Sequence, residues 1–398
     1  MKVLLLVLLT TVSLSATTLD QLVDAALADN PSLEAIEAKI AASQEAIGLA
    51  DNFDDPMIGL AINAIHPDDI TNRSIERMQS TAITISQRIP FFGKRDEKVA
   101  AAKAQKRQLD DQLEQAEALL AATVRSEAYA LWSVQKLLQI ESETAALMRH
   151  NADLFEGYSA TASKAHMGIM AAELALSSSA MVQESLREAA AKRRARLSYL
   201  CGITVETLEL DPKVTELPDI ADMQQQLASN YALKASEAAI EQKKAQHAYE
   251  ALQHYSDPTL QVGFFQREQF EDYVSLSLSF ALPVYGSEDA KEQIAKQQLL
   301  EQEYDHSDLK RKVQSDFDTA VASLQSSYER YRILSDESLP KLEHMFELAS
   351  ASISTGDDLE RYIGLIERKL MLEKQRIAAI AEFSAARATL NALTGVIR

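Results

Sequence analysis

The sequence predicts a mainly α-helical protein with a small β part, in which one structural plan occurs twice along the chain. Glycine occurs 11 times and proline 9 times in 398 residues, which is about 5% together against roughly 12% in an average protein. Outside two short regions, apolar residues recur in steps of three and four, the period of a helix. A set of landmarks also appears twice in the same order. We therefore expect duplicated long coiled-coil helical hairpins and two β-hairpins, one in each copy.

The chain begins with a pattern typical of an export signal, which we assign to residues 1–16. Lys2 precedes an apolar run from Val3 to Leu14, and small residues follow up to Ala16. A charged start, a short apolar core and a small-x-small end are the marks of a secretory signal peptide. The run is shorter than the roughly 20 residues of a membrane-spanning helix. We therefore expect an exported protein, and the alternative is an uncleaved anchor.

Two structural repeats follow at residues 17–202 and 227–398, with an inter-repeat linker at 203–226. The interval from Pro90 to Gly202 equals the interval from Pro283 to Gly395, so the second half keeps the spacing of the first. The landmarks that recur are Asn30-Pro31-x-Leu33 as Asn230-Tyr231-x-Leu233, Asp55-Pro56 as Asp257-Pro258, Ile89-Pro90-Phe91-Phe92-Gly93 as Leu282-Pro283-Val284-Tyr285-Gly286, and Leu200-x-Gly202 as Leu393-x-Gly395.

Each repeat changes from helical to strand period and back at its prolines. Both repeats are expected to contain a helix, a β-hairpin, a long helix and a return helix, in that order. In the first repeat these are a helix from Asn30 to Asn52, a β-hairpin at 57–89, a long helix from Lys94 to about Tyr158 and a return helix from about Lys164 to Leu200; the second β-hairpin is at 259–282.

The hairpins alternate apolar residues with small or polar ones. The clearest stretch is Val274-Ser275-Leu276-Ser277-Leu278-Ser279-Phe280. A period of two with one apolar face indicates strands that have different surroundings on their two sides. Four such strands cannot span a bilayer alone, because the smallest membrane barrels have about eight. The hairpins therefore either pack inside a soluble domain, or several chains donate four strands each to a shared barrel.

The residues that join strands to helices form a candidate site. Phe91, Phe92 and Tyr285 at these junctions suit a membrane–water interface, and the alternative is an apolar plug in a bend. The full set of junction residues is Pro56, Pro90, Phe91, Phe92, Gly93, Pro258, Pro283, Tyr285 and Gly286.

Composition and motifs exclude several classes of protein. The net charge of −19 argues against a nucleic-acid partner. The single cysteine, Cys201, excludes a disulfide scaffold and a cysteine-based zinc site, and its counterpart is Thr394, which predicts a packing role. We find no P-loop, dinucleotide turn, His-Glu-x-x-His or nucleophile elbow, and expect no enzymatic activity, cofactor or metal site. His166, Met167 and Met170 offer ligands for a soft metal, but methionine on a helix is more typical of packing.

With these landmarks in duplicated order, essentially the whole mature chain resembles the TolC-type outer-membrane efflux proteins. The resemblance implies a homotrimer in the outer membrane of a Gram-negative bacterium, with a trimeric α-barrel tunnel in the periplasm and a shared 12-stranded transmembrane β-barrel in lipid. It also implies a periplasmic adaptor protein and an inner-membrane efflux pump as partners. The stretch Pro90-Phe91-Phe92-Gly93-Lys94-Arg95 is similar to the heavy-metal and cation efflux branch.

The resemblance further implies that helix tips at 158–168 and 352–363 face the adaptor and form the gate. Gly356 opens the second tip, and Ser163 stands opposite it in the first. The acidic residues nearest to the family's constriction are Asp357, Asp358 and Glu360. They predict either a carboxylate ring that favours cations or ordinary solvated acids at a helix start.

These observations favour an outer-membrane duct that carries small substrates, metal cations among them. The alternatives are a periplasmic coiled-coil adaptor of an export system, and an outer-membrane duct for drugs or polypeptide secretion.

Overall fold

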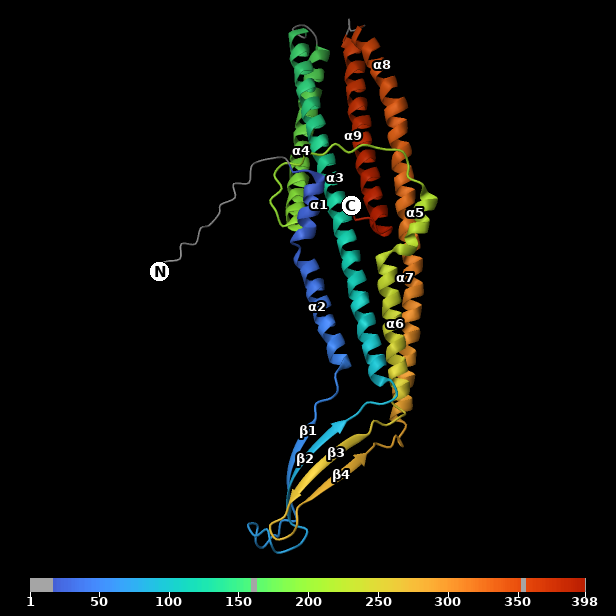
Figure 1. Ribbon diagram of the computed structural model, residues 1–398. Coiled ribbons are helices and arrows are strands. Elements are labelled where there is room, and N and C mark those ends of the chain that lie inside the picture. The colour runs from blue at the N-terminus through green and yellow to red at the C-terminus, as the bar shows by residue number, and fades with distance from the viewer. Residues whose placement is uncertain (1–16, 159–162, 352–355, 398) are drawn as a thin grey trace, which may run out of the picture. The chain divides into compact units, whose positions relative to one another are not determined.

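A computed structural model describes residues 17–397 of the chain, with the exception of 159–162 and 352–355. The predicted export signal, residues 1–16, lies outside the described residues. The described chain is mostly helical and contains one small sheet (Figure 1). The predicted fold class is confirmed, with long helices and one β-hairpin in each of the two repeats.

The order of elements repeats along the chain (Figure 1). The first half contains α1 (Leu19–Ala28), α2 (Pro31–Asp51), β1 (Met57–Asn63), β2 (Ser80–Arg88), α3 (Lys94–Tyr158) and α4 (Ser163–Cys201). The second half contains α5 (Ile220–Gln226), a 3₁₀ turn (Leu227–Ser229), α6 (Tyr231–Leu252), β3 (Thr259–Gln266), β4 (Tyr273–Ser279), α7 (Ser287–Arg332), a π-helical turn (Ile333–Ser338), α8 (Leu339–Ala351) and α9 (Gly356–Leu393). The helix α5 lies within the stretch that the sequence assigned to the linker.

The chain forms two compact units, and each takes residues from both repeats. The helical unit comprises the described residues up to Glu34, together with Glu114–Asn230 and Lys312 onward. The sheet unit comprises Ala35–Leu113 and Tyr231–Arg311. The two long helices α3 and α7 contribute residues to both units, so the units do not coincide with the sequence repeats.

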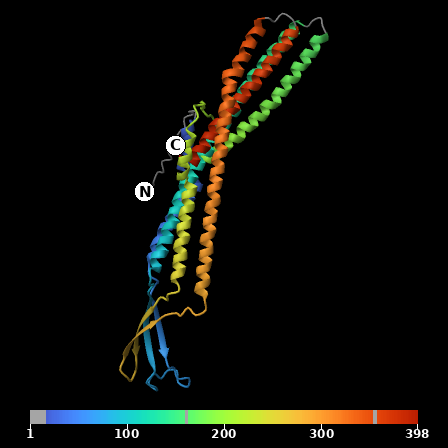
Figure 2. The same ribbon diagram turned by 90° about the vertical axis from the view of Figure 1, so that its right-hand side faces the viewer.

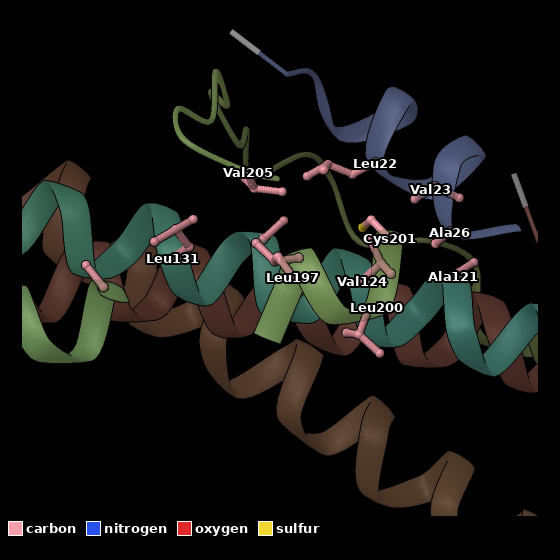
Figure 3. Close-up of a cluster of buried hydrophobic side chains, with 12 residues drawn as sticks. Leu22, Val23, Ala26, Ala121, Val124, Leu131, Leu197, Leu200, Cys201 and Val205 are labelled. Atoms are coloured by element: carbon pink, nitrogen blue, oxygen red, sulfur yellow. The ribbon is translucent and has the colours of Figure 1, made fainter. Parts of the chain in front are cut away.

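The core of the helical unit lies where α1, α3 and α4 meet (Figure 3). Leu22 of α1, Val124 of α3 and Leu197 of α4 are all fully buried there. Alanines at the same crossing keep the side chains small, which lets the helices approach closely. Cys201 is 3% exposed and belongs to this cluster. It therefore occupies a packing position.

Each repeat closes on itself through an asparagine at the start of a helix. The Asn30 Nδ2 donates a hydrogen bond to the carbonyl of Leu200 at 3.2 Å. The Asn230 Nδ2 donates in the same way to the carbonyl of Leu393 at 2.8 Å. Both bonds join the beginning of a repeat to the last turn of its own return helix. The paired landmarks of the sequence therefore mark the same structural joint in both copies.

The second long helix differs from the first because it contains the π-helical turn before α8. Pro340 follows this turn, whereas Leu147 occupies the corresponding place in α3. Proline has no N–H to donate and its ring crowds the carbonyl four residues earlier, which is that of Asp336. One wider turn accommodates both defects. Beyond it α8 runs alongside α9, as both views show (Figure 2).

The four strands of the sheet unit form one antiparallel sheet in the order β1-β2-β3-β4 (Figure 1). Leu60 of β1 lies opposite Ile83 of β2, which lies opposite Phe264 of β3. Phe264 in turn lies opposite Val274 of β4. Residues directly opposite each other share a face of the sheet, so this row is apolar across all four strands.

Candidate functional site

One face of the sheet is mostly apolar and open. The edge strands β1 and β4 expose 57–78% of the apolar side chains on this face, and the inner strands expose 36–54%. The side chains concerned are Ile58, Leu60, Ile62, Ile83, Ile85, Leu260, Val262, Phe264, Val274, Leu276 and Leu278. An open apolar patch of this kind marks a surface for another protein or a membrane.

The opposite face of the sheet is small and polar. One row across the four strands reads Gly59, Thr84, Gly263 and Ser275. A Cβ atom on either glycine would lie 2.7 Å from a neighbouring side chain, so that position stays small. Most apolar residues of the strands thus lie on one face and most small or polar residues on the other, as in strands with lipid on one side and water on the other.

An aromatic pair near the hairpin turns interrupts this small polar face. The rings of Phe265 and Tyr273 stack with their centroids 4.7 Å apart and an interplanar angle of 4°. The Arg267 guanidinium lies 5.1 Å from the centroid of the Tyr273 ring. The two rings are large for this face, since the neighbouring row consists of glycine, threonine and serine.

Both outer edges of the sheet are unpaired. Within the described residues, no strand lies beyond β1 or beyond β4. Each edge therefore presents a row of backbone N–H and C=O groups without ladder partners. Such edges are not tolerated in lipid and pair readily with another chain.

The junction between strands and helices carries exposed aromatic and apolar side chains. Phe91 is 47%, Phe92 58% and Tyr285 94% exposed. The ring of Phe92 packs against that of Tyr255, with the centroids 4.8 Å apart. The side chains are therefore not a buried plug within this chain. Their position next to the apolar face suits a membrane–water boundary.

A buried ion pair ties the two repeats together at this junction. The Lys94 Nζ lies 2.9 Å from the Asp257 Oδ1, and the two side chains are 3% and 8% exposed. The backbone N–H of Phe91 donates to the same carboxylate at 3.1 Å, and the Arg88 Nε lies 3.7 Å from it. Lys94 also donates to the carbonyl of Tyr255. Both charges thus have partners, as buried charges require.

The predicted junction glycines have the same geometry in both repeats. Gly93 has φ 79° and Gly286 has φ 69°, in the left-handed region where only glycine is unstrained. The carbonyl of Gly93 accepts the N–H of Glu97 at 3.1 Å, and that of Gly286 accepts the N–H of Ala290 at 3.2 Å. Each glycine therefore turns the chain from sheet into helix at equivalent positions.

The predicted tip residues lie at helix starts. Ser163 begins α4 and Gly356 begins α9, which places Asp357, Asp358 and Glu360 in its first turns. The side chains of these five residues, and the connecting turns at 159–162 and 352–355, lie outside the described residues. The first and second tips therefore remain sequence predictions.

Below the tips, a buried carboxylate connects three helices. Glu141 of α3 is 5% exposed and accepts a hydrogen bond from the Ser179 Oγ of α4 at 2.9 Å. The Lys374 Nζ of α9 lies 2.6 Å from the other carboxylate oxygen. The pair joins the α3–α4 hairpin of the first repeat to the return helix of the second.

Two further features are absent from the described part of the chain. Among these residues, no group of three or more His, Cys, Asp and Glu side chains is arranged to hold a metal ion. In the same part of the chain, no helix is both long enough and apolar enough to cross a membrane.

Comparison with known families gives a match over the first repeat. Residues 22–202 match the family model described as outer membrane efflux protein. This match covers the first repeat, which is similar to the outer membrane efflux proteins. A comparison with curated protein sequences gives no match.

Solved structures of outer membrane proteins share the fold of nearly the whole chain. The CmeC outer membrane channel of Campylobacter jejuni matches with a TM-score of 0.76 at 14% identity. The match covers 95% of this chain and 85% of the CmeC chain. The open state of the MtrE outer membrane channel of Neisseria gonorrhoeae gives 0.78 at 16% identity, with 95% and 88% covered. The outer membrane protein VceC of Vibrio cholerae gives 0.77 at 14% identity, with 95% and 96% covered.

The family match and the shared fold support an outer-membrane location with a periplasmic helical extension. The matched family is one of transport channels, not of enzymes. The sequence placed the junctions and hairpins, but it did not reveal the Lys94–Asp257 pair, the Glu141–Lys374 pair or the Phe265–Tyr273 stack. The first two pairs join residues that are far apart in the chain, and no local pattern indicates them.

Proposed function

We propose that this protein is the outer-membrane duct of a tripartite efflux system and that three copies of the chain form one channel. In this arrangement the three sheets close into a shared 12-stranded barrel in lipid, and the helices form a tunnel in the periplasm. The duct receives its cargo from an inner-membrane pump through a periplasmic adaptor protein. It has no chemical step of its own, so transport is driven by the pump.

The observation that carries this proposal is the four-stranded sheet with one apolar face, one small polar face and two unpaired edges. One sheet alone leaves its edges open, and lipid does not tolerate open edges. Closure with copies of the same chain satisfies the edges and keeps the apolar face of each sheet on the outer surface. A periplasmic adaptor needs no such sheet, so the alternative function leaves this feature without a purpose.

The experiment is expression of the full chain in a Gram-negative host, followed by membrane fractionation and chemical cross-linking. We expect the protein in the outer-membrane fraction, trimers on a denaturing gel, and ion conductance when the purified protein is added to a planar lipid bilayer. A monomer recovered from the soluble periplasmic fraction, or a protein found in the inner membrane, would contradict the proposal.

We further propose that the tips at Ser163 and Gly356 form the gated end of the duct and meet the adaptor. Asp357, Asp358 and Glu360 lie in the first turns of α9, where acids suit the positive end of the helix dipole. Three chains would bring their acids into one ring, which favours passage of cations. Opening would then be a change in how the helices pack near the tips.

Ion selectivity tests this part of the proposal. The double variant Asp357→Asn, Asp358→Asn should lower the cation preference of the channel, measured as the reversal potential across a salt gradient in a planar bilayer. Glu301→Gln in α7, an exposed acid outside the tips, serves as the control and should leave the preference unchanged. An unchanged reversal potential in the double variant would leave the acids with a capping role only.

Metal cations are the cargo that we propose, because the stretch from Pro90 to Arg95 is similar to the heavy-metal branch. A strain that lacks the duct should become more sensitive to copper, silver or zinc salts and regain tolerance with the intact gene. Sensitivity to drugs alone, or loss of a secreted polypeptide alone, would assign the duct to the alternative cargo.

A further inference from the structure

We propose that the two open edges of the sheet join between chains in one defined register, with Leu278 of one chain opposite Leu60 of the next. This inference rests on the proposed trimer and adds the residues that form its seam in the membrane. The partner is a second copy of this chain, and the internal duplication supplies the geometry.

The starting point is the pairing of β2 with β3, where the first repeat meets the second inside one chain. Arg88 lies opposite Thr259 in this antiparallel pair. The ladder continues one residue further, since the N–H of Ile89 donates to the carbonyl of Pro258 at 2.9 Å. This is the one contact between repeats in the sheet, and the seam between chains is the same contact with the repeats in reverse order.

Because the two repeats correspond residue by residue, the β2–β3 pairing also predicts how β4 of one chain pairs with β1 of the next. We call this contact between chains the seam. The counterpart of Arg88 in the second repeat is Ala281, as fixed by the shared Pro-x-x-Gly junction. The counterpart of Thr259 in the first repeat is Met57, as fixed by the shared Asp-Pro pair. Ala281 of one chain is therefore opposite Met57 of the next. The two strands that meet, β4 and β1, run antiparallel in this arrangement, as β2 and β3 do.

The register can be checked against side chains that played no part in deriving it. It places Phe280 opposite Ile58, Leu278 opposite Leu60, and Leu276 opposite Ile62. All six side chains are apolar and 57–78% exposed in the single chain. Leu60, Ile62, Leu276 and Leu278 lie on the apolar face of the sheet. A slip of one residue would place each of them opposite a residue of the polar face, so the derived register is self-consistent.

The contact between repeats inside one chain and the proposed seam between chains differ in their charged residues. Inside the chain, the Asp257 carboxylate is held by Lys94 and Arg88. At the seam its counterpart is Asp55, and the counterparts of Lys94 and Arg88 are Ser287 and Ala281. Asp55 is exposed and has no hydrogen bond or ion pair with any described residue. The seam therefore relies on strand pairing and apolar contact without the lysine.

Engineered disulfides test the register in the full-length trimer. In a Cys201→Ser background, the pair Ser277→Cys and Ala61→Cys should form a disulfide on mild oxidation, because the register places these exposed polar-face residues opposite each other. Within one chain the two positions are separated by three strand spacings of ~4.8 Å, so the bridge must join two chains. We expect bands of linked dimer and trimer on a non-reducing gel, which a reductant abolishes.

Matched pairs provide the controls. Ser275→Cys with Asn63→Cys is a second pair in the same register and should also cross-link. Ser279→Cys with Ala61→Cys, and Ser275→Cys with Ala61→Cys, are displaced by two residues and should give several-fold less product. Conductance of each reduced variant in a planar bilayer shows whether the channel has assembled.

The outcomes separate this inference from the proposed function. If glutaraldehyde shows trimers and only a displaced pair forms a disulfide, or none does, the register is overturned and the duct stands. If glutaraldehyde shows no trimer at all, both fail together. Cross-linking of the two in-register pairs above the displaced ones supports the seam.

Discussion

At the scale of single residues, burial changes the reactivity of the one cysteine, Cys201. Cys201 is packed between α1, α3 and α4 in the helical unit. Burial raises the pKa of its thiol to about 11. Because the thiolate is the reactive form, only on the order of a thousandth of the thiol is reactive near pH 8. Sequence reasoning predicted the packing role, since the second repeat has Thr394 there.

We therefore predict that Cys201 of the folded protein reacts very slowly with a maleimide at pH 8. Unfolding in detergent and urea should restore the reactivity of an ordinary thiol, whose pKa is ~8.5. The measurement is the rate of labelling, followed by mass. An exposed engineered thiol, Ser277→Cys, gives the matched fast rate. Equal labelling rates at the two positions would contradict the buried location.

The stacked rings of Phe265 and Tyr273 give a second prediction at this scale. They rise from a face made mostly of small residues, so in the proposed barrel they narrow the water-filled passage. The double variant Phe265→Ser, Tyr273→Ser should increase single-channel conductance in a planar bilayer. Phe264→Leu, a change on the opposite face of the same strand, is the control and should leave conductance unchanged. A constriction elsewhere would make the double variant indistinguishable from the native channel.

At the scale of elements, sequence patterns predicted where helices and strands begin and end but not how they pair. Period and proline positions indicated the hairpins, and α3 begins and ends at the predicted residues. The π-helical turn before Pro340 did not emerge, because a helix-breaking residue does not specify how the helix adjusts. Register did not emerge either, since a period of two determines which residues share a face and leaves their partners across the sheet undetermined.

The Glu141–Lys374 pair joins elements of both repeats and leads to a stability prediction. Lys374→Met leaves the Glu141 carboxylate buried with only Ser179 as partner. We expect a loss of ~1–3 kcal/mol in unfolding free energy, below the ~3–5 typical of fully buried pairs because the Lys374 side chain is 35% exposed.

The measurement is the midpoint of thermal unfolding followed by helical circular dichroism, with a double-mutant cycle as control. The double variant Glu141→Leu, Lys374→Met removes both charges and should recover much of the lost stability. If the double variant is as unstable as the sum of the single variants, the two charges do not interact.

At the scale of the whole molecule, the two kinds of contact between repeats predict where the assembly separates. The contact within a chain has the buried Lys94–Asp257 pair, and the proposed contact between chains has Ser287 beside Asp55. The contact between chains lacks the ion pair, so we expect it to open first on heating. Trimers should therefore dissociate into chains before the four-stranded sheet of each chain is lost.

Ser287→Lys should strengthen the weaker contact by supplying the missing cation for Asp55 of the next chain. We expect the temperature at which trimers dissociate on a denaturing gel to rise by several degrees. Adding Asp55→Asn should remove this gain, while Asp54→Asn, which affects the neighbouring acid, should not. A gain that persists without Asp55 would show that the lysine acts elsewhere.

The asparagine that closes each repeat has a consequence for the history of the chain. Asn30 and Asn230 each bond the final turn of their own repeat, so a single repeat already carries the means to fold back on itself. Gene duplication then needed to supply only a tether between two ready-made units. The features that distinguish the copies, such as Lys94 against Ser287 and the unequal hairpin loops, arose afterwards. These differences now distinguish the contact between repeats inside one chain from the proposed contact between chains.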